Sequence, residues 1–175
     1  QNRILRSAAY EGMCDTLGHP QSSYYELYEK LSTGGAGAII TGFVAVNRTG
    51  RSFRRMGIID DDAYIEEFRK LSSIVHGNDT PIIMQIVHCG GLSSKAVTNA
   101  EPVAPSPFLN LLALHMARKL SETGIEKIVD DFVKAVIRVR ESGIDGVQLH
   151  AAHGYLLSEF LSPSVNKRSD RWGGT

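Results

Sequence analysis

Two histidines and a tyrosine follow a short apolar stretch near the end of the sequence. His150 and His153 are three residues apart, and Tyr155 lies two residues beyond the second histidine. Two neutral imidazoles each donate one N–H, so the pair is suited to hold a carbonyl or nitro oxygen that gains negative charge. A tyrosine with a pKa near about 10 keeps its proton at neutral pH and can act as a general acid. This set suits reduction of an activated double bond, and because no side chain supplies hydride, a redox cofactor is required.

The same spacing allows two other interpretations. A histidine pair at this spacing can share a zinc ion, but catalytic zinc usually has three protein ligands. No acidic residue or cysteine stands at matching spacing from His150 and His153. Ordinary packing at the end of a strand is the third interpretation. The donor interpretation is favoured because it also gives Tyr155 a role.

Two more polar residues, Gln85 and His88, lie within and directly after another apolar run, "PIIMQIV". A polar side chain in a buried strand needs a hydrogen-bond partner, so Gln85 fits a ligand or a neighbouring backbone group equally well. His88 precedes a flexible "CGG" segment, and we interpret it as a structural residue. Ligands bind at the carboxyl ends of strands in parallel α/β folds. Both sets of polar residues, the pair Gln85 and His88 and the set that begins at His150, occur at such strand ends.

The elements that must position these residues alternate along the chain. Strands are predicted from apolar runs of the length that buried parallel strands prefer, at Arg3–Ala8, Ala38–Thr41, Pro81–Val87 and Gly146–His150. Helices are predicted between them, at Ser22–Leu31 with a capping box of Ser23 and Glu26, from Asp60 to Gly77, and from a capping box of Thr123 and Glu126 to Gly143. The stretch from His88 to Glu122 lacks periodicity and is predicted to be a long functional loop.

Strand and helix alternation predicts a parallel α/β sheet, for which two architectures compete. An open doubly wound sheet commonly carries a glycine-rich phosphate loop after its first strand, whereas "RSAAYEGM" has only Gly12. A (β/α)₈ barrel takes about 250 residues. Four strands in 175 residues would therefore be only half of a barrel.

Composition and charge exclude several classes of protein. Nineteen basic residues balance nineteen acidic ones, and no block of like charge suggests nucleic acid or an anionic membrane as a partner. Apolar runs are shorter than the roughly 20 residues that span a bilayer. Cys14 and Cys89 are expected to be reduced, and we expect a soluble cytoplasmic protein that acts on a small molecule.

The segment "GVQLHAAHGYLLSEFLSPSVNKRSDRWGGT" closely resembles the signature of the old yellow enzyme family, the FMN-dependent NADH:flavin oxidoreductases. Its motifs H-x-x-H-G-Y-L, F-L-S-P, N-x-R-x-D and G-G occur in family order. The similarity extends upstream through "PIIMQIVHCGG", "YYELYEKLSTGGAGAIITG" and "NRILRSAAYEGM". The resemblance covers essentially residues 1–175 and implies the N-terminal half of a single flavin-binding (β/α)₈ barrel, roughly its first four βα units.

The resemblance implies roles for individual residues. FMN would contact Thr41, Gly42 and the segment Ser7, Ala8, Ala9 and Tyr10, and Gln85 would bond its pyrimidine edge. His150, next to the flavin, and His153 would bind the substrate oxygen. Tyr155 would protonate the α-carbon after hydride from flavin N5 reaches the β-carbon. NADH or NADPH would be the reductant, and an α,β-unsaturated carbonyl or similar compound the acceptor.

The chain also departs from the family pattern. Tyr10 stands where one branch has a flavin-tuning cysteine, and Cys14 lies four residues later, so we do not expect Cys14 to tune the flavin. Gly91 replaces a frequent arginine, and Arg171 and Trp172 replace the common acidic residue and tyrosine before G-G. The later strands that would supply a basic residue and the phosphate loops are outside these 175 residues.

Three functional hypotheses follow. The first is an ene-reductase-type flavoenzyme. The second is a catalytically incomplete half-barrel that associates with a partner half or with itself as a homo-oligomer, because open sheet edges need covering. The third is a zinc-dependent barrel hydrolase.

Overall fold

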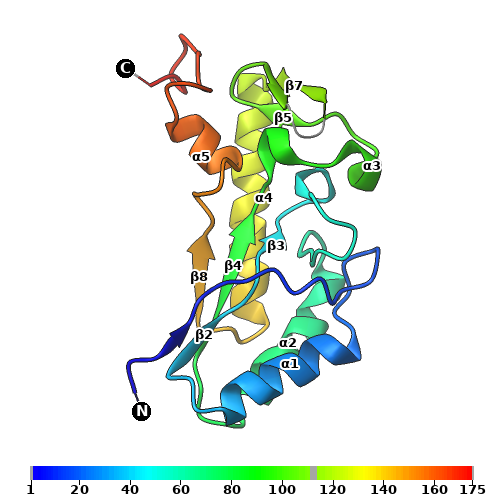
Figure 1. The fold of residues 1–175 in the computed structure, drawn as a ribbon, viewed down its shortest axis with the longest axis vertical. Coiled ribbons are helices and arrows are strands. Elements are labelled where there is room, and N and C mark those ends of the chain that lie inside the picture. The colour runs from blue at the N-terminus through cyan, green and yellow to red at the C-terminus, as the bar shows by residue number, and fades with distance from the viewer. Residues whose placement is uncertain (1, 111–113, 175) are drawn as a thin grey trace.

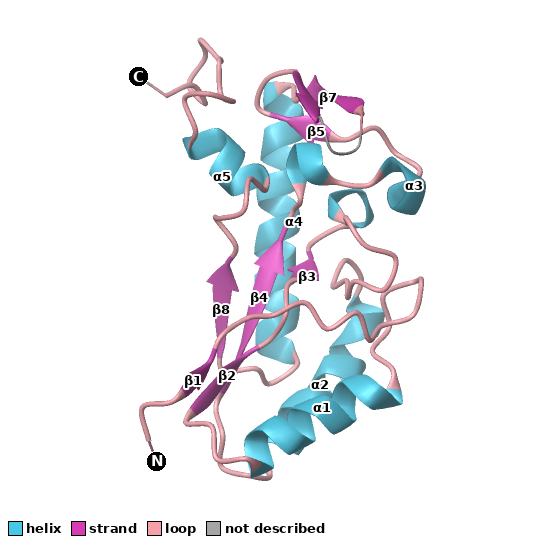
Figure 2. Cartoon of the chain, viewed as in Figure 1, coloured by secondary structure: helices cyan, strands magenta, loops and turns pink. Residues whose placement is uncertain are grey.

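A parallel sheet forms the centre of the computed structural model, which describes residues 2–110 and 114–174 (Figures 1 and 2). β4 is the middle strand: Ile83 pairs with Ile40 on one side and Gly146 on the other. The sheet comprises β1 (Leu5–Arg6), β2 (Ala38–Ile40), β3 (Val44–Ala45), β4 (Ile82–Val87) and β8 (Gly146–Leu149). The four predicted strands are confirmed within narrower bounds, and β3 was missed.

β2 and β3 run along the same edge of β4 with one extra residue between them. Ile40 pairs with Ile83 and Val44 with Ile86, so residues 41–43 stand opposite residues 84 and 85. Such a bulge interrupts the ladder and redirects the neighbouring side chains. Strand β3 was missed because this interruption separates its two residues from the apolar run before them.

The three predicted helices are confirmed as α1 (Ser22–Thr33), α2 (Ile65–His76) and α4 (Glu122–Glu141). Both predicted capping boxes were wrong. Helix α1 begins after Gln21, without a side-chain cap, and α4 begins after Ser121, whose hydroxyl accepts the Gly124 N–H. Ser121 is the N-cap because the helix starts at Glu122, one residue before Thr123, which leaves Thr123 inside the first turn.

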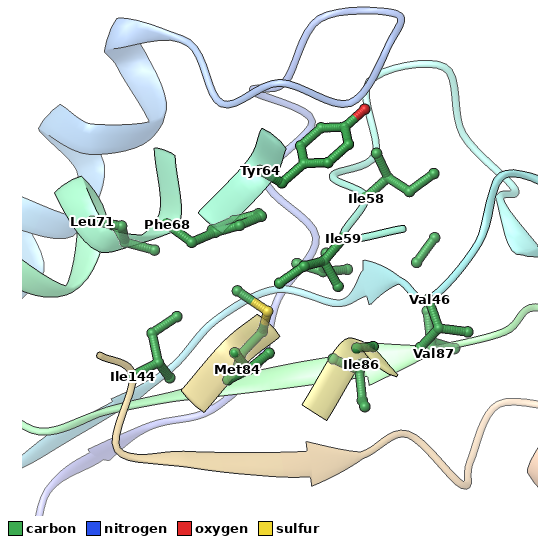
Figure 3. Packing of buried hydrophobic residues seen from close by; sticks show 14 of the residues in the cluster. Val46, Ile58, Ile59, Tyr64, Phe68, Leu71, Met84, Ile86, Val87 and Ile144 are labelled. Carbon is green, nitrogen blue, oxygen red and sulfur yellow. The ribbon is translucent and has the colours of Figure 1, made fainter. Parts of the chain in front are cut away.

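The core lies between the sheet and these helices. Alternate residues of β4 point toward the helices, and Met84 and Ile86 are fully buried there. Figure 3 shows Phe68 and Leu71 of α2 on the same side of the sheet as Met84. The opposite alternation leaves Gln85 on the other face of the sheet, which is the inner face of a barrel.

The predicted long loop from His88 to Glu122 is not irregular throughout. It contains a three-stranded sheet in the order β5 (Val103–Ala104), β7 (His115–Lys119), β6 (Phe108–Asn110), seen at the upper end of Figure 1. Residues 111–113 of this stretch lie outside the described residues. The remaining short elements are η1 (Arg48–Gly50), η2 (Asp62–Tyr64), η3 (Gly90–Leu92), α3 (Lys95–Thr98) and α5 (Leu156–Leu161).

One side of the molecule exposes apolar residues. Leu149 on β8 is 54% exposed, and Val129 and Val133 on α4 are 48% and 52% exposed. Leu5 on β1, the opposite outer strand, is 51% exposed. β1 and β8 are therefore open edges of a partial barrel. In the part of the chain that the structure describes, no helix is long and apolar enough to cross a membrane.

Candidate active site

The carboxyl ends of β1, β4 and β8 converge on an open pocket of about 490 Å³. Pockets of this size hold small ligands and cofactors. Among the predicted site residues, the ones that line it are Ala8, Ala9, Tyr10, Gln85, His150 and His153. The convergence follows from the parallel topology, because the three strands end at the same edge of the sheet.

The two histidines and the tyrosine lie together after β8. The ring centroids are 5.0 Å apart for His150 and His153, 4.9 Å for His150 and Tyr155, and 6.3 Å for His153 and Tyr155. The turn between them is tight: His153 has φ 57° and Gly154 has φ 73°, both left-handed. This turn brings the His153 ring close to the His150 ring, so that His150, His153 and Tyr155 form a cluster of three rings.

His150 is arranged as a neutral donor. Its side chain is only 5% exposed, and the Ala152 N–H donates to its Nδ1 at 3.3 Å. Burial, with a smaller contribution from the nearby His153, lowers the pKa of His150 below its ordinary value. The neutral ring therefore carries its proton on Nε2 and has one N–H to donate.

Tyr155 is arranged as a protonated phenol. Burial, followed by the Cys89 thiol, raises its pKa to about 12. Its backbone is fixed at the start of α5, where its N–H donates to the Ala152 carbonyl at 3.1 Å. Tyr155 lines a neighbouring open pocket of about 720 Å³, together with Phe53, Asn110 and His115. The three-ring cluster thus forms a wall between two pockets.

Two glutamine amides face the first pocket from paired strands. Gln85 and Gln148 are partners in the register of β4 and β8, and Gln85 Nε2 donates to Gln148 Oε1 at 2.6 Å. Gln148 was not among the residues predicted from the sequence. Its spacing two residues before His150 could have found it, because alternate strand residues share a face. Paired amides offer both donors and acceptors, the chemistry that the pyrimidine edge of a flavin requires.

Three of the predicted cofactor contacts do not line the pocket. Ser7 is exposed and precedes the lining residues. Thr41 is fully buried, and its hydroxyl accepts the Gln85 backbone N–H at 3.1 Å. The Gly42 N–H donates to a carboxylate oxygen of Glu11 at 2.8 Å. Thr41 and Gly42 thus do not face the pocket but hold the backbone of Gln85 and the side chain of Glu11.

His88 occupies a different environment from His150. It is 1% exposed, and burial lowers its pKa to about 4. Its Nδ1 accepts the Gly90 N–H at 3.0 Å, which fixes the turn after β4. These contacts agree with the structural interpretation of this residue.

Glu159, which the sequence did not single out, supports the same turn. Its carboxyl is 2% exposed, and one oxygen accepts the Gly91 N–H at 2.8 Å. Burial raises the pKa of Glu159 to about 8. A buried carboxyl at this place gives the Gly91 backbone a structural partner.

Metal-ligating residues do not gather elsewhere in residues 2–110 and 114–174. Over these ranges no group of three or more histidines, cysteines or acidic residues could hold a metal ion. His150 and His153 remain a pair.

The comparisons with known proteins identify the family. The model of the NADH:flavin oxidoreductase / NADH oxidase family matches residues 1–175, and the chain belongs to this family, whose members use FMN with NADH or NADPH. The chain is 36% identical to a metal reductase of Desulforamulus reducens, over 99% of this chain and 26% of that protein. It is 32% identical to an NADPH dehydrogenase of a Geobacillus species, over 100% of this chain and 51% of that protein.

The fold comparison agrees. The old yellow enzyme homologue from Zymomonas mobilis superposes with a TM-score of 0.94 at 30% identity, covering 99% of this chain and 51% of that one. The chain spans between about a quarter and half of the length of these relatives. It therefore has roughly the first four βα units of a (β/α)₈ barrel, as predicted from the sequence.

Proposed function

We propose that this chain forms part of an FMN-dependent enzyme that uses NADH or NADPH to reduce an activated C=C bond, such as that of an α,β-unsaturated carbonyl. The observation that carries the proposal is the cluster of His150, His153 and Tyr155, with centroids 4.9 to 6.3 Å apart, at the wall between two open pockets. This cluster combines two oxygen-binding donors with one proton donor.

The histidine pair binds and polarises the acceptor. The His150 and His153 rings donate N–H groups to the carbonyl oxygen of the acceptor, which draws electron density away from the β-carbon. The low pKa of His150 keeps its imidazole neutral, so the negative charge that develops on this oxygen is stabilised by hydrogen bonds. When bound, FMN supplies the hydride that the β-carbon accepts, after taking it from NADH or NADPH.

Tyr155 completes the addition across the double bond. Its O–H gives a proton to the α-carbon, and the phenolate then regains a proton from solvent. A pKa of about 12 keeps the phenol protonated at neutral pH. The 720 Å³ pocket beside Tyr155 accommodates the part of the acceptor beyond its double bond.

The first pocket fits the flavin ring. Gln85 would bond the pyrimidine edge, with Gln148 holding the Gln85 amide in place. Ala8 and Ala9 are small residues that leave room for a flat ring. Thr41 and Gly42 fix the strand ends around it through their bonds to the Gln85 backbone and to Glu11. The described residues of this lining include no lysine or arginine. We therefore propose that the FMN phosphate is bound by barrel segments beyond residue 175.

Rapid mixing of the flavin-loaded protein tests the role of Tyr155. We expect Tyr155→Phe to slow acceptor reduction about a hundredfold, since a general acid contributes about 10²- to 10⁴-fold, and to leave reduction of the flavin by NAD(P)H nearly unchanged. Tyr25→Phe is the matched control, because the Tyr25 hydroxyl donates to the Glu67 carbonyl and Tyr25 is not part of the three-ring cluster. Equal losses in both half-reactions of Tyr155→Phe would reject the proton-donor role.

We further propose that residues 1–175 are the N-terminal half of one flavin-binding barrel. The open edges of β1 and β8 and the exposed face of α4 support this, because unpaired edges and apolar faces need covering. The second hypothesis, association of the isolated chain with a partner half or with itself, rests on the same surfaces.

Light scattering of the isolated chain tests whether these surfaces are open. We expect self-association that rises with concentration and is weakened by Leu149→Lys, which places a charge on the outer edge of β8. Arg140→Lys at an exposed position of α4 serves as a control. A monomer at high concentration would contradict an open half-barrel.

A further inference from the structure

Behind the proposed flavin pocket lies a buried ionic cluster of Arg6, Glu11 and Tyr28. The side chains of Arg6 and Glu11 are 18% and 7% exposed, and Arg6 Nη2 lies 3.4 Å from Glu11 Oε1. The Tyr28 hydroxyl donates to the same carboxylate oxygen. Burial, followed by the nearby Glu11 charge, raises the pKa of Tyr28, so this phenol stays a donor.

The cluster holds the bulge between β2 and β3. The Gly42 N–H has left the ladder and points at Glu11 Oε1 at 2.8 Å and at the Tyr28 hydroxyl at 3.0 Å. Arg6 Nη1 donates to the Ile40 carbonyl at 2.7 Å, on the other side of the bulge. A Cβ on Gly42 would meet Glu11 at 2.0 Å and the Ala9 carbonyl at 2.4 Å, so only glycine lets the two segments approach this closely.

The bulge directs Phe43 toward the three-ring cluster. The Phe43 ring centroid lies 5.8 Å from His150 and 5.8 Å from Tyr155, in edge contacts with both. On its other side, Phe43 stacks on Tyr10 at 5.4 Å. Glu11 follows Tyr10 directly in the chain, so one carboxylate fixes both segments that carry these aromatic rings.

We infer that Glu11, together with Arg6 and Tyr28, is a positioning group that sets the geometry of the His150 and Tyr155 pair through the Gly42 bulge and Phe43. Glu11 acts at a distance from the reacting atoms and contacts neither histidine. The inference rests on the proposed function for its consequence in catalysis, but its structural consequence is measurable without turnover.

The test combines Glu11→Gln with a readout on the histidine rings. The amide keeps the size of the side chain and one acceptor oxygen but removes the charge that Arg6 and Tyr28 hold. NMR of protein with ¹³C-labelled histidine reports the ring C–H signals. We expect Glu11→Gln to shift the His150 signal, because the Phe43 ring above it moves. Phe43→Leu, recorded alongside, identifies the shift that arises from this ring.

Glu67→Gln is the control for general destabilisation. Glu67, on α2, is also a partly buried carboxylate, and its Oε1 lies 2.9 Å from His19 Nδ1. We expect it to lower the melting temperature without moving the His150 signal. Unchanged His150 signals in Glu11→Gln, with only a lower melting temperature, would overturn the inference.

In the flavin-loaded protein, Glu11→Gln should lower kcat for acceptor reduction roughly ten- to a hundredfold, with less effect on KM, since small misplacements of catalytic groups cost this much. Tyr28→Phe, which removes the second acceptor of the Gly42 N–H, should produce the same signal shift and a smaller loss of kcat. If the His150 signal moves while acceptor reduction is unaffected, the positioning contact exists but the proposed role of His150 fails.

Discussion

The ends of β4 and β8 carry histidines in nearly the same local arrangement and very different surroundings. His88 and His150 each follow a strand, and each accepts the backbone N–H of the residue two positions on through Nδ1, at 3.0 and 3.3 Å. Burial lowers the pKa of both. His88 is enclosed by protein on all sides, whereas His150 lines a pocket beside a second histidine and a tyrosine. The local motif fixes the tautomer, and the space beyond Nε2 decides whether the ring can meet a ligand.

The largest expected effect separates the two histidines by function. His150→Leu should lower the rate of acceptor reduction about 10²- to 10³-fold, the usual cost of removing one oxyanion donor. His88→Gln, which keeps an acceptor for the Gly90 N–H, should leave that rate nearly unchanged. Single-turnover mixing with the reduced flavoprotein measures both. Comparable losses in the two variants would mean that the two strand ends do not differ as proposed.

The second largest effect concerns how His88 contributes to the pH dependence of the stability of the protein. His88 has a folded pKa of about 4, below the value of about 6.5 in an unfolded chain, so the folded state binds fewer protons. The contribution of His88 to the free energy of unfolding is fully present above a pH of about 6.5. It falls by up to about 3 kcal/mol as the pH decreases toward about 4.

Urea unfolding at several pH values between these limits checks the sign. We expect His88→Gln to flatten the decline of the free energy of unfolding on acidification. His76→Gln serves as the comparison, because His76 is an exposed residue paired with Asp145, and it should leave the decline in place. A decline of the same steepness in His88→Gln would show that His88 is not the titrating group.

The smallest effect concerns the amide pair that links the two strand ends. Gln148→Ala removes the acceptor of the Gln85 amide, and the loss of one hydrogen bond of about 1 kcal/mol corresponds to about fivefold weaker FMN binding. Quenching of FMN fluorescence on titration measures this. Gln21→Ala, at an exposed position before α1, should have no effect. FMN affinity that is the same in Gln148→Ala and the parent protein would remove Gln148 from the proposed flavin contacts.

Much of this site was predictable because it consists of short motifs at strand ends. The spacing of His150, His153 and Tyr155 indicated a donor pair with an acid, and the alternation of strands and helices indicated a parallel sheet that ends in ligand-binding residues. Gln148 was within reach of the same reasoning, since it shares a strand face with His150. The small sheet between His88 and Glu122 was not, because its strands are only two to five residues long and have no periodicity of their own.

The sequence by itself determined the order of the three long helices and of four strands of the parallel sheet, and the residue types that gather at the strand ends, since these depend on local spacing and hydrophobic pattern. The tertiary structure alone decided which polar residues reach the pocket and which support it from behind. Thr41 and Gly42 turn away because of one extra residue opposite β4, and Glu11 is buried because Tyr28 and Arg6, from separate elements, meet it there. Contacts between separate elements, such as Tyr28 with Glu11, are not apparent from any local sequence pattern.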